Sequence, residues 1–244
     1  MDKRLLKLNF KTFTSAIADL AMPRICVVCH RALMPSEHHI CLPCLADLPR
    51  TRFANLSHNP MADAYNERIE ADRYQYATAL FYYDSEEKYS RITQALKYER
   101  NFGAGRYFAG MLGRELKESP LYADVDLVIP VPLHWTRRLK RGYNQAEVIA
   151  REIARELGAS IVPSALVRTR RTGSQVRLSG ESRANNVSGA FSVRRPSALS
   201  GVHHILIVDD VLTTGATLAA CYGALRRVLP ADVRISLATL GFVP

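Results

Sequence analysis

The chain carries ILIVDDVLTTGATL at residues 205–218, and the order of residue types in this stretch predicts its architecture. Four aliphatic residues run directly into two acids, then into a Thr/Gly-rich turn and the start of a helix. In open α/β sheets ligands bind outside the carboxyl ends of strands, and a turn that enters a helix presents free backbone N–H groups to an anion. The turn residues expected to cradle a phosphate are Thr213, Thr214, Gly215, Ala216 and Thr217.

The two acids in front of this turn indicate which kind of phosphate it would hold. Asp209 and Asp210 stand where paired carboxylates can accept hydrogen bonds from vicinal ribose hydroxyls. A phosphate turn alone is common in proteins, but an acid pair directly before it favours a sugar phosphate as the ligand.

Strand and helix patterns alternate in the rest of the chain. Strands are expected at 78–83, 126–129, 205–208 and 233–240, and helices at 86–100, 106–118, 144–157 and 215–229. Such alternation implies a parallel sheet with crossover connections, so we expect an α/β fold with a Rossmann-like sheet flanked by helices.

The chain is expected to have four parts. Residues 1–22 predict an amphipathic helix, 23–48 a four-cysteine module, 49–72 a polar linker, and 73–244 one large α/β domain. The helix is predicted from the helical spacing of Leu6, Phe10, Phe13, Ile17 and Leu20.

The spacing of four cysteines predicts a metal site. Cys26 and Cys29 form one CxxC pair, and Cys41 and Cys44 form a second pair after eleven intervening residues. Two such pairs can complete a closed, structural Zn²⁺ site of four thiolates. The alternative is a set of buried cysteines without metal. Cys221 stands alone in a later apolar helix and is expected to serve in packing.

The formal charge is +10, with a sequence pI of about 9.6, and the excess is concentrated. Residues 131–200 hold thirteen Lys/Arg against four Asp/Glu. Such a field attracts polyphosphates or a nucleic acid backbone, although a solvated basic face would have the same composition. Apolar stretches are too short for a membrane span, and Lys3, Arg4, Lys7 and Lys11 interrupt any signal-like segment. We therefore expect a cytoplasmic protein.

The 205–218 stretch resembles the PRPP-binding motif of type I phosphoribosyltransferases, where PRPP is 5-phosphoribosyl-1-pyrophosphate. Together with segments 95–109, 126–150 and 168–191 it resembles the ComF family, bacterial phosphoribosyltransferase-like proteins associated with competence and DNA uptake. The resemblance covers the chain from about Pro23 to Leu240. It implies a type I phosphoribosyltransferase fold, a parallel sheet with a hood, behind a small zinc-ribbon-like module.

The resemblance also assigns roles to residues. Asp209 and Asp210 would bind the ribose 2′ and 3′ hydroxyls, and the turn up to Thr217 would hold the 5-phosphate. Arg141 and Gly142, followed by Tyr143, are similar to the Arg-Gly-aromatic sequence that closes the pyrophosphate loop. The polar stretch 168–186 suits a lid over departing pyrophosphate, with Gln175 as a PRPP contact and with catalytic roles for Arg177 and Arg183, and for Asp209 and Asp210.

Two functions remain open from the sequence. One is Mg²⁺-dependent transfer of a phosphoribosyl group to a nitrogen acceptor, with Mg²⁺ on the phosphate oxygens of PRPP and an acceptor pocket built from residues 77–124. The other is a PRPP or sugar-phosphate sensor that binds single-stranded DNA during uptake or repair, with Trp135 and Tyr143 as residues that can stack on bases.

Overall fold

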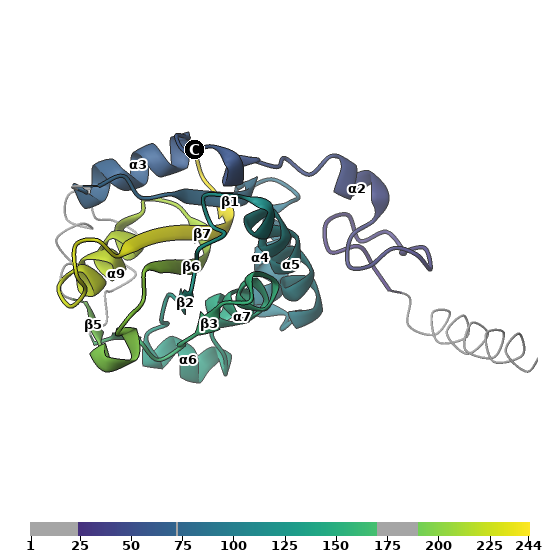
Figure 1. Ribbon diagram of the computed structural model, residues 1–244. Coiled ribbons are helices and arrows are strands. Elements are labelled where there is room, and N and C mark those ends of the chain that lie inside the picture. The colour runs from purple at the N-terminus through teal and green to yellow at the C-terminus, as the bar shows by residue number, and fades with distance from the viewer. Residues whose placement is uncertain (1–23, 72, 170–189) are drawn as a thin grey trace, which may run out of the picture. The chain divides into compact units, whose positions relative to one another are not determined.

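The computed structural model describes residues 24–71, 73–169 and 190–244 (Figure 1). The chain divides into two compact units, Met1–Leu48 and Pro49–Pro244. In its described part the first unit contains helix α2, Leu42–Ala46, and two isolated bridges, Ile25 with Ala32 and His38 with Ile40. The amphipathic helix predicted over 1–22 lies outside the described residues.

The second unit contains a five-stranded sheet in the order β1-β7-β6-β2-β3, in which every neighbouring pair is parallel. Its strands are β1 (Ala77–Tyr82), β2 (Leu127–Pro130), β3 (Ser160–Ile161), β6 (His204–Leu212) and β7 (Arg234–Phe242), with β4 (Leu166–Arg168) and β5 (Phe191–Val193) as a separate antiparallel pair. Its helices are η1 (Phe53–Asn55), α3 (Pro60–Ile69), α4 (Ser90–Tyr98), α5 (Phe102–Glu118), α6 (Trp135–Arg141), α7 (Gln145–Leu157), η2 (Pro196–Leu199) and α9 (Ala216–Arg226). The predicted parallel α/β fold is confirmed.

The order of the strands creates a switch point between β2 and β6. From β2 the chain runs outward to β3, then returns to β6 on the other side of β2 and continues to β7. The connections that follow β2 and β6 therefore leave in opposite directions, which opens a crevice at the carboxyl ends of these two strands. The Val131 N–H donates to the Val208 carbonyl at 2.9 Å, so the two strands stay paired up to that edge.

Helices cover both faces of the sheet. Figure 1 shows α3 and α9 on one face, and α4, α5 and α7 on the other. The central strand β6 is buried on both sides, and residues 205–208 have no exposed surface. A continuous aliphatic run is typical of parallel strands in this position. No helix within the described residues has the length and apolar character needed to cross a membrane.

The linker predicted over 49–72 is wrong, because this segment is part of the second unit. Helix α3 buries Met61, Ala62 and Tyr65 in the main core. It begins with a regular start signal, in which the Asn59 side chain accepts the Ala62 N–H at 2.9 Å and a proline follows. A polar segment with few apolar residues predicts a linker, but those few apolar residues lie on one face of the helix and pack in the core.

A buried histidine joins β6 to β7 at the amino end of the sheet. His204 is fully buried, with Nδ1 2.6 Å from Asp124 Oδ1 and Nε2 2.7 Å from Ser236 Oγ. Burial lowers the pKa of His204 although Asp124 opposes this shift. A neutral ring then donates from Nδ1 and accepts from the serine hydroxyl. The order Asp-His-Ser resembles a catalytic triad, but Ser236 has no exposed surface and this network is structural.

Candidate functional site

Strand β6 carries the acid pair to the carboxyl edge of the sheet. It extends to Leu212, four residues beyond the predicted end, and so includes both acids. Successive side chains of a strand point to opposite faces. Asp210, 6% exposed, forms an ion pair with Lys97 of α4 at 2.9 Å. Asp209 lies toward the other face, where its charge acts on Cys221 of α9, and its Oδ1 accepts the Asp210 N–H at 2.8 Å.

Asp209 and Asp210 are neighbouring carboxylates, so it is unfavourable for both to be charged at the same time. Burial, and then the charge of Asp210, raise the pKa of Asp209 to about 8. Lys97 and Arg168 lower it in part. A cation or a pair of hydroxyl donors placed against these carboxylates would stabilise their charged forms. The strand end therefore suits a ligand that brings hydroxyls and a metal ion.

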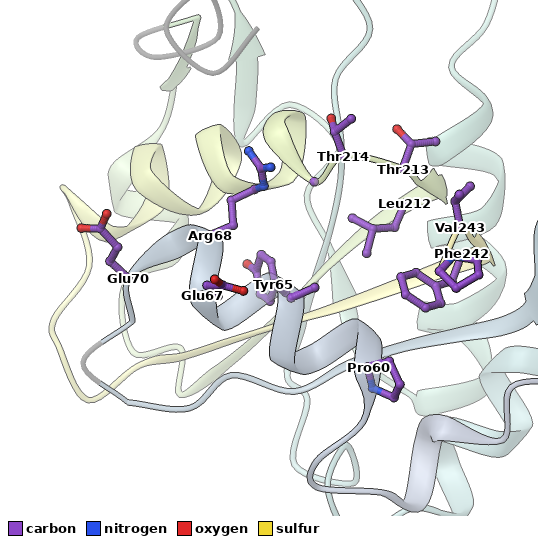
Figure 2. A pocket seen from close by; sticks show the side chains of 13 residues that line it. Pro60, Tyr65, Glu67, Arg68, Glu70, Leu212, Thr213, Thr214, Phe242 and Val243 are labelled. Atoms are coloured by element: carbon purple, nitrogen blue, oxygen red, sulfur yellow. The ribbon is translucent and has the colours of Figure 1, made fainter. Parts of the chain in front are cut away.

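The turn after β6 has the geometry of a phosphate cradle. Gly215 has a φ of 70° and stands directly before α9, whose first residues are Ala216 and Thr217. The first N–H groups of a helix have no partner within it, and they attract anions. Thr213 and Thr214 precede the glycine and add two hydroxyl groups (Figure 2). The structure thus brings the predicted turn residues together next to the acid pair.

An arginine from α3 lies against this turn, and the sequence did not indicate it. A Cβ on Gly215 would come 3.1 Å from Arg68 Cδ and 3.4 Å from Arg68 Nε. Arg68 lines a cavity of about 660 Å³ together with Tyr65, Thr213, Thr214 and Phe242, between α3, the turn and the end of β7 (Figure 2). This places a further positive charge beside the candidate phosphate turn.

The segment after β2 contains a helix, although the sequence predicts none between the strand at 126–129 and the helix at 144–157. Helix α6 spans Trp135–Arg141, with the His134 side chain as its N-cap and Gly142 at a φ of 81° as its C-cap. The sequence does not predict this helix because its apolar residues Trp135 and Leu139 form no core face and are 62% and 75% exposed. The predicted pyrophosphate contacts Arg141 and Gly142 therefore lie at a helix end.

The carboxyl end of α4 fixes this helix end in place. The Arg141 guanidinium lies 5.3 Å from the ring centre of Tyr98, and the Tyr143 hydroxyl donates to the Leu96 carbonyl. Between these two contacts lies Lys97, which reaches Asp210. Lys97 and Tyr98 were not among the predicted site residues, although the segment 95–109 that contains them resembled the family. Their contacts depend on tertiary structure.

The lid candidates Gln175, Arg177 and Arg183 lie outside the described residues. On either side of them, β4 and β5 pair in antiparallel register from Arg168 opposite Phe191 to Leu166 opposite Val193. Because Arg168 acts on the charge of Asp209, the base of this two-stranded ribbon is near the acid pair.

The four cysteines of the first unit lie together. Their Sγ atoms are all within 4.8 Å of one another, and those of Cys29 and Cys41 are 3.7 Å apart. Tetrahedral Zn²⁺ with Zn–S bonds of about 2.3 Å places two sulfurs roughly 3.8 Å apart. Burial would raise the pKa of Cys26, but backbone N–H groups, including that of Val28, lower it to about 7. The cluster has the size and donor set to hold one zinc ion.

A buried carboxylate organises the loop between the two cysteine pairs. Glu37, 4% exposed, accepts the N–H groups of Met34 and Leu42, each at 2.8 Å, and pairs with Arg31 at 2.9 Å. Since Leu42 directly follows Cys41, these bonds hold the second pair in register with the first.

Comparison with known proteins defines the class of the second unit. Residues 140–241 match the family model described as the phosphoribosyl transferase domain. The match includes β6, the acid pair, the turn, α9 and nearly all of β7. A parallel sheet with this strand end is a phosphoribosyltransferase-type fold.

Two relatives indicate which family within the phosphoribosyltransferase-type proteins the chain is similar to. Competence protein F of Haemophilus influenzae is 30% identical over 152 residues, which cover 61% of this chain and 66% of that protein. DNA utilization protein YhgH of Salmonella typhi is 32% identical over 149 residues, which cover 60% of this chain and 64% of that protein. The match thus spans just under two thirds of the length of these relatives. Together with the phosphoribosyl transferase domain, these relatives support a ComF-family phosphoribosyltransferase-like protein.

A solved structure is also similar to part of the chain. Glutamine phosphoribosylpyrophosphate amidotransferase from B. subtilis, complexed with ADP and GMP, is 20% identical, with a TM-score of 0.36, and the similarity covers 55% of this chain and 26% of that one. A TM-score this low does not by itself establish a common fold, so the assignment rests on the sheet and the family match.

Proposed function

We propose that the second unit binds PRPP with Mg²⁺ at the carboxyl edge of β6 and β2 and transfers its phosphoribosyl group to a nitrogen acceptor. The main support is that one strand end presents two carboxylates directly before a glycine-centred turn at the start of α9. Carboxylates suit the ribose diol, and the free N–H groups of the turn suit the 5-phosphate. We assign the pyrophosphate to the end of α6 at Arg141 and Gly142, because α6 follows β2 and the switch point lies between β2 and β6.

The chemistry of this transfer is a substitution at the anomeric carbon. The C1–O bond to pyrophosphate breaks and its electron pair leaves with pyrophosphate, while a nitrogen lone pair forms the C1–N bond and that nitrogen loses its proton to solvent. Mg²⁺ would neutralise charge on the phosphate oxygens, with Asp209 or Asp210 as its protein carboxylate. Arg177 and Arg183 would stabilise the leaving group and Gln175 would contact PRPP.

A second cavity offers space for the acceptor. It has a volume of about 660 Å³ and lies where β1 ends, lined by Tyr82, Tyr83, Asp84 and Glu87 and by Thr213 of the turn. This is within the region 77–124 from which an acceptor pocket was expected. Aromatic rings and carboxylates favour a flat acceptor with N–H donors.

The names of the relatives connect this activity to DNA. We propose that the protein acts in the cytoplasm and serves competence and DNA uptake; the names of the relatives, which refer to competence and to DNA utilization, support a role connected with DNA. The first unit would carry one structural Zn²⁺ on Cys26, Cys29, Cys41 and Cys44.

Calorimetric titration with PRPP and Mg²⁺ tests the site. We expect the Asp209→Asn/Asp210→Asn variant to bind PRPP at least about a hundredfold more weakly than the wild type, since each charged hydrogen bond contributes about 1.5–3 kcal/mol. The exposed Asp232→Asn change serves as the control and should leave binding unchanged. A wild type that does not bind PRPP would refute the proposal.

A second candidate function, single-stranded DNA binding, is favoured by the exposed surface of α6 and of the end of α4. Trp135 and Tyr98 are 62% and 72% exposed, and Arg141 adds a charge beside the Tyr98 ring. Aromatic rings with arginines are typical of single-strand binding surfaces. Tyr143, the other residue expected to stack, is instead packed edge-on against Phe102 at 4.7 Å.

The contribution of Trp135 can be measured by fluorescence anisotropy with a labelled oligonucleotide. We expect Trp135→Ala to weaken binding about tenfold, as the loss of one stacked base contributes about 1–3 kcal/mol, and we expect affinity to fall as salt rises. Leu139→Ala on the same helix removes exposed apolar surface without an aromatic ring and should have a smaller effect. Equal affinities of the wild type and Trp135→Ala for the oligonucleotide would show that Trp135 does not stack on a base.

A further inference from the structure

Lys97 lies between the acid pair and the candidate pyrophosphate site, which is the end of α6 at Arg141 and Gly142. Its Nζ is 2.9 Å from Asp210 Oδ2, and its side chain is 21% exposed. The residues on either side of Lys97 contact the end of α6. The Leu96 carbonyl accepts a hydrogen bond from the Tyr143 hydroxyl, and the Arg141 guanidinium lies over the Tyr98 ring. The last turn of α4 therefore contacts both the acid pair of β6 and the end of α6.

The ammonium group of Lys97 can donate hydrogen bonds to further acceptors besides its contact with Asp210. It carries three N–H donors. Within the described part of the chain its nearest charged partner is the Asp210 carboxylate, in an ion pair of 2.9 Å, and a single ion pair leaves at least two of these donors for other acceptors. Burial would lower the pKa of Lys97, but the charge of Asp210 raises it above its usual value. A protonated, partly buried ammonium with free donors is suited to an anion.

We propose that Lys97 binds the pyrophosphate oxygens of PRPP while it remains paired with Asp210. This inference rests on the proposed function, because it assumes that PRPP occupies the crevice. Lysine binds phosphate groups as a point charge on a flexible chain, so it can contact a new oxygen without losing its first partner. Lys97 would thereby connect the ribose-binding acid to the leaving group, a role for a residue outside the matched domain 140–241.

A simpler role is that Lys97 acts only as the counterion of Asp210. A double-mutant cycle with Mg²⁺ and inorganic pyrophosphate as the probe distinguishes the two roles. We expect Lys97→Met to weaken pyrophosphate binding about tenfold, Lys97→Arg to keep most of the affinity, and Lys97→Met to cause the same loss in an Asp210→Asn background. If Lys97→Met has no effect in that background, Lys97 is a counterion and the inference is wrong.

Two controls keep the result interpretable. Lys117→Met on the exposed side of α5 makes the same change in net charge and should bind pyrophosphate like the wild type. Circular dichroism and thermal unfolding show whether each variant is folded. A wild type that binds neither PRPP nor pyrophosphate contradicts the proposed function itself. A wild type that binds both, with an unchanged Lys97→Met variant, contradicts only the role of Lys97.

Discussion

Gly215→Val is expected to reduce PRPP binding by at least about a hundredfold while the protein stays folded. The φ of 70° at this position is strained for a β-branched residue, at about 1–3 kcal/mol. The new Cβ would also come 3.1 Å from Arg68 Cδ, so the Arg68 side chain must move by a few tenths of an ångström, and relief of the backbone strain at this φ shifts the turn itself. Because the turn N–H groups must all converge on one phosphate, a shift of the turn removes several hydrogen bonds together. Calorimetric titration with PRPP and Mg²⁺ measures the loss.

Gly201→Val is the matched control for this prediction. Gly201 also has a positive φ, 74°, but a Cβ there meets no atom within 4 Å, and it precedes β6 at the other end of the strand. It should lose similar stability through backbone strain and keep its affinity for PRPP. If both variants bind PRPP as the wild type does, the turn at Gly215 does not hold the phosphate.

The strand end at Asp209 and the turn that follows were predictable because they form one contiguous stretch. The order of aliphatic strand, acids, glycine and helix fixes their relative positions through local geometry alone. The residues that complete the site come from distant segments. Lys97 is more than a hundred residues from Asp210, and Arg68 is still farther from Gly215. Only the packing of α3 and α4 around the sheet brings these two charges to the strand end.

Two α-helices of the second unit, α3 and α6, are not predicted by the sequence, for opposite physical reasons. Helix α3 has a start signal at Asn59 but few apolar residues, so the sequence predicts a linker there although a small face is buried. Helix α6 has apolar residues at helical spacing, Trp135 and Leu139, but they face solvent and cannot be recognised as a core face. The first case shows that a short buried face is enough for a helix supported by its neighbours. The second shows that helical spacing of apolar residues predicts a packed helix only where those residues are buried, and Trp135 and Leu139 are 62% and 75% exposed.

Removal of one cysteine ligand is expected to unfold the cysteine module and leave the second unit intact. The described part of the first unit is only residues 24–48, and domains below about 40 residues usually need a metal or disulfides to fold. Zinc binding to modules of this kind contributes about 10–16 kcal/mol at pH 7, far more than so small an apolar core can supply. Cys41→Ser should therefore abolish both the bound zinc and the protection of residues 24–48 from hydrogen exchange.

Metal analysis of untagged protein and hydrogen exchange of the 24–48 peptides measure these two effects separately. Cys221→Ala, which changes a buried cysteine of α9 outside the cluster, should retain one zinc per chain and full protection of the module. The buried Glu37 bonds would survive in Cys41→Ser only if the loop folds without metal, because the Leu42 N–H that Glu37 accepts belongs to the residue after the lost ligand. Protection that persists without zinc would mean that this carboxylate, and not the ion, holds the module together.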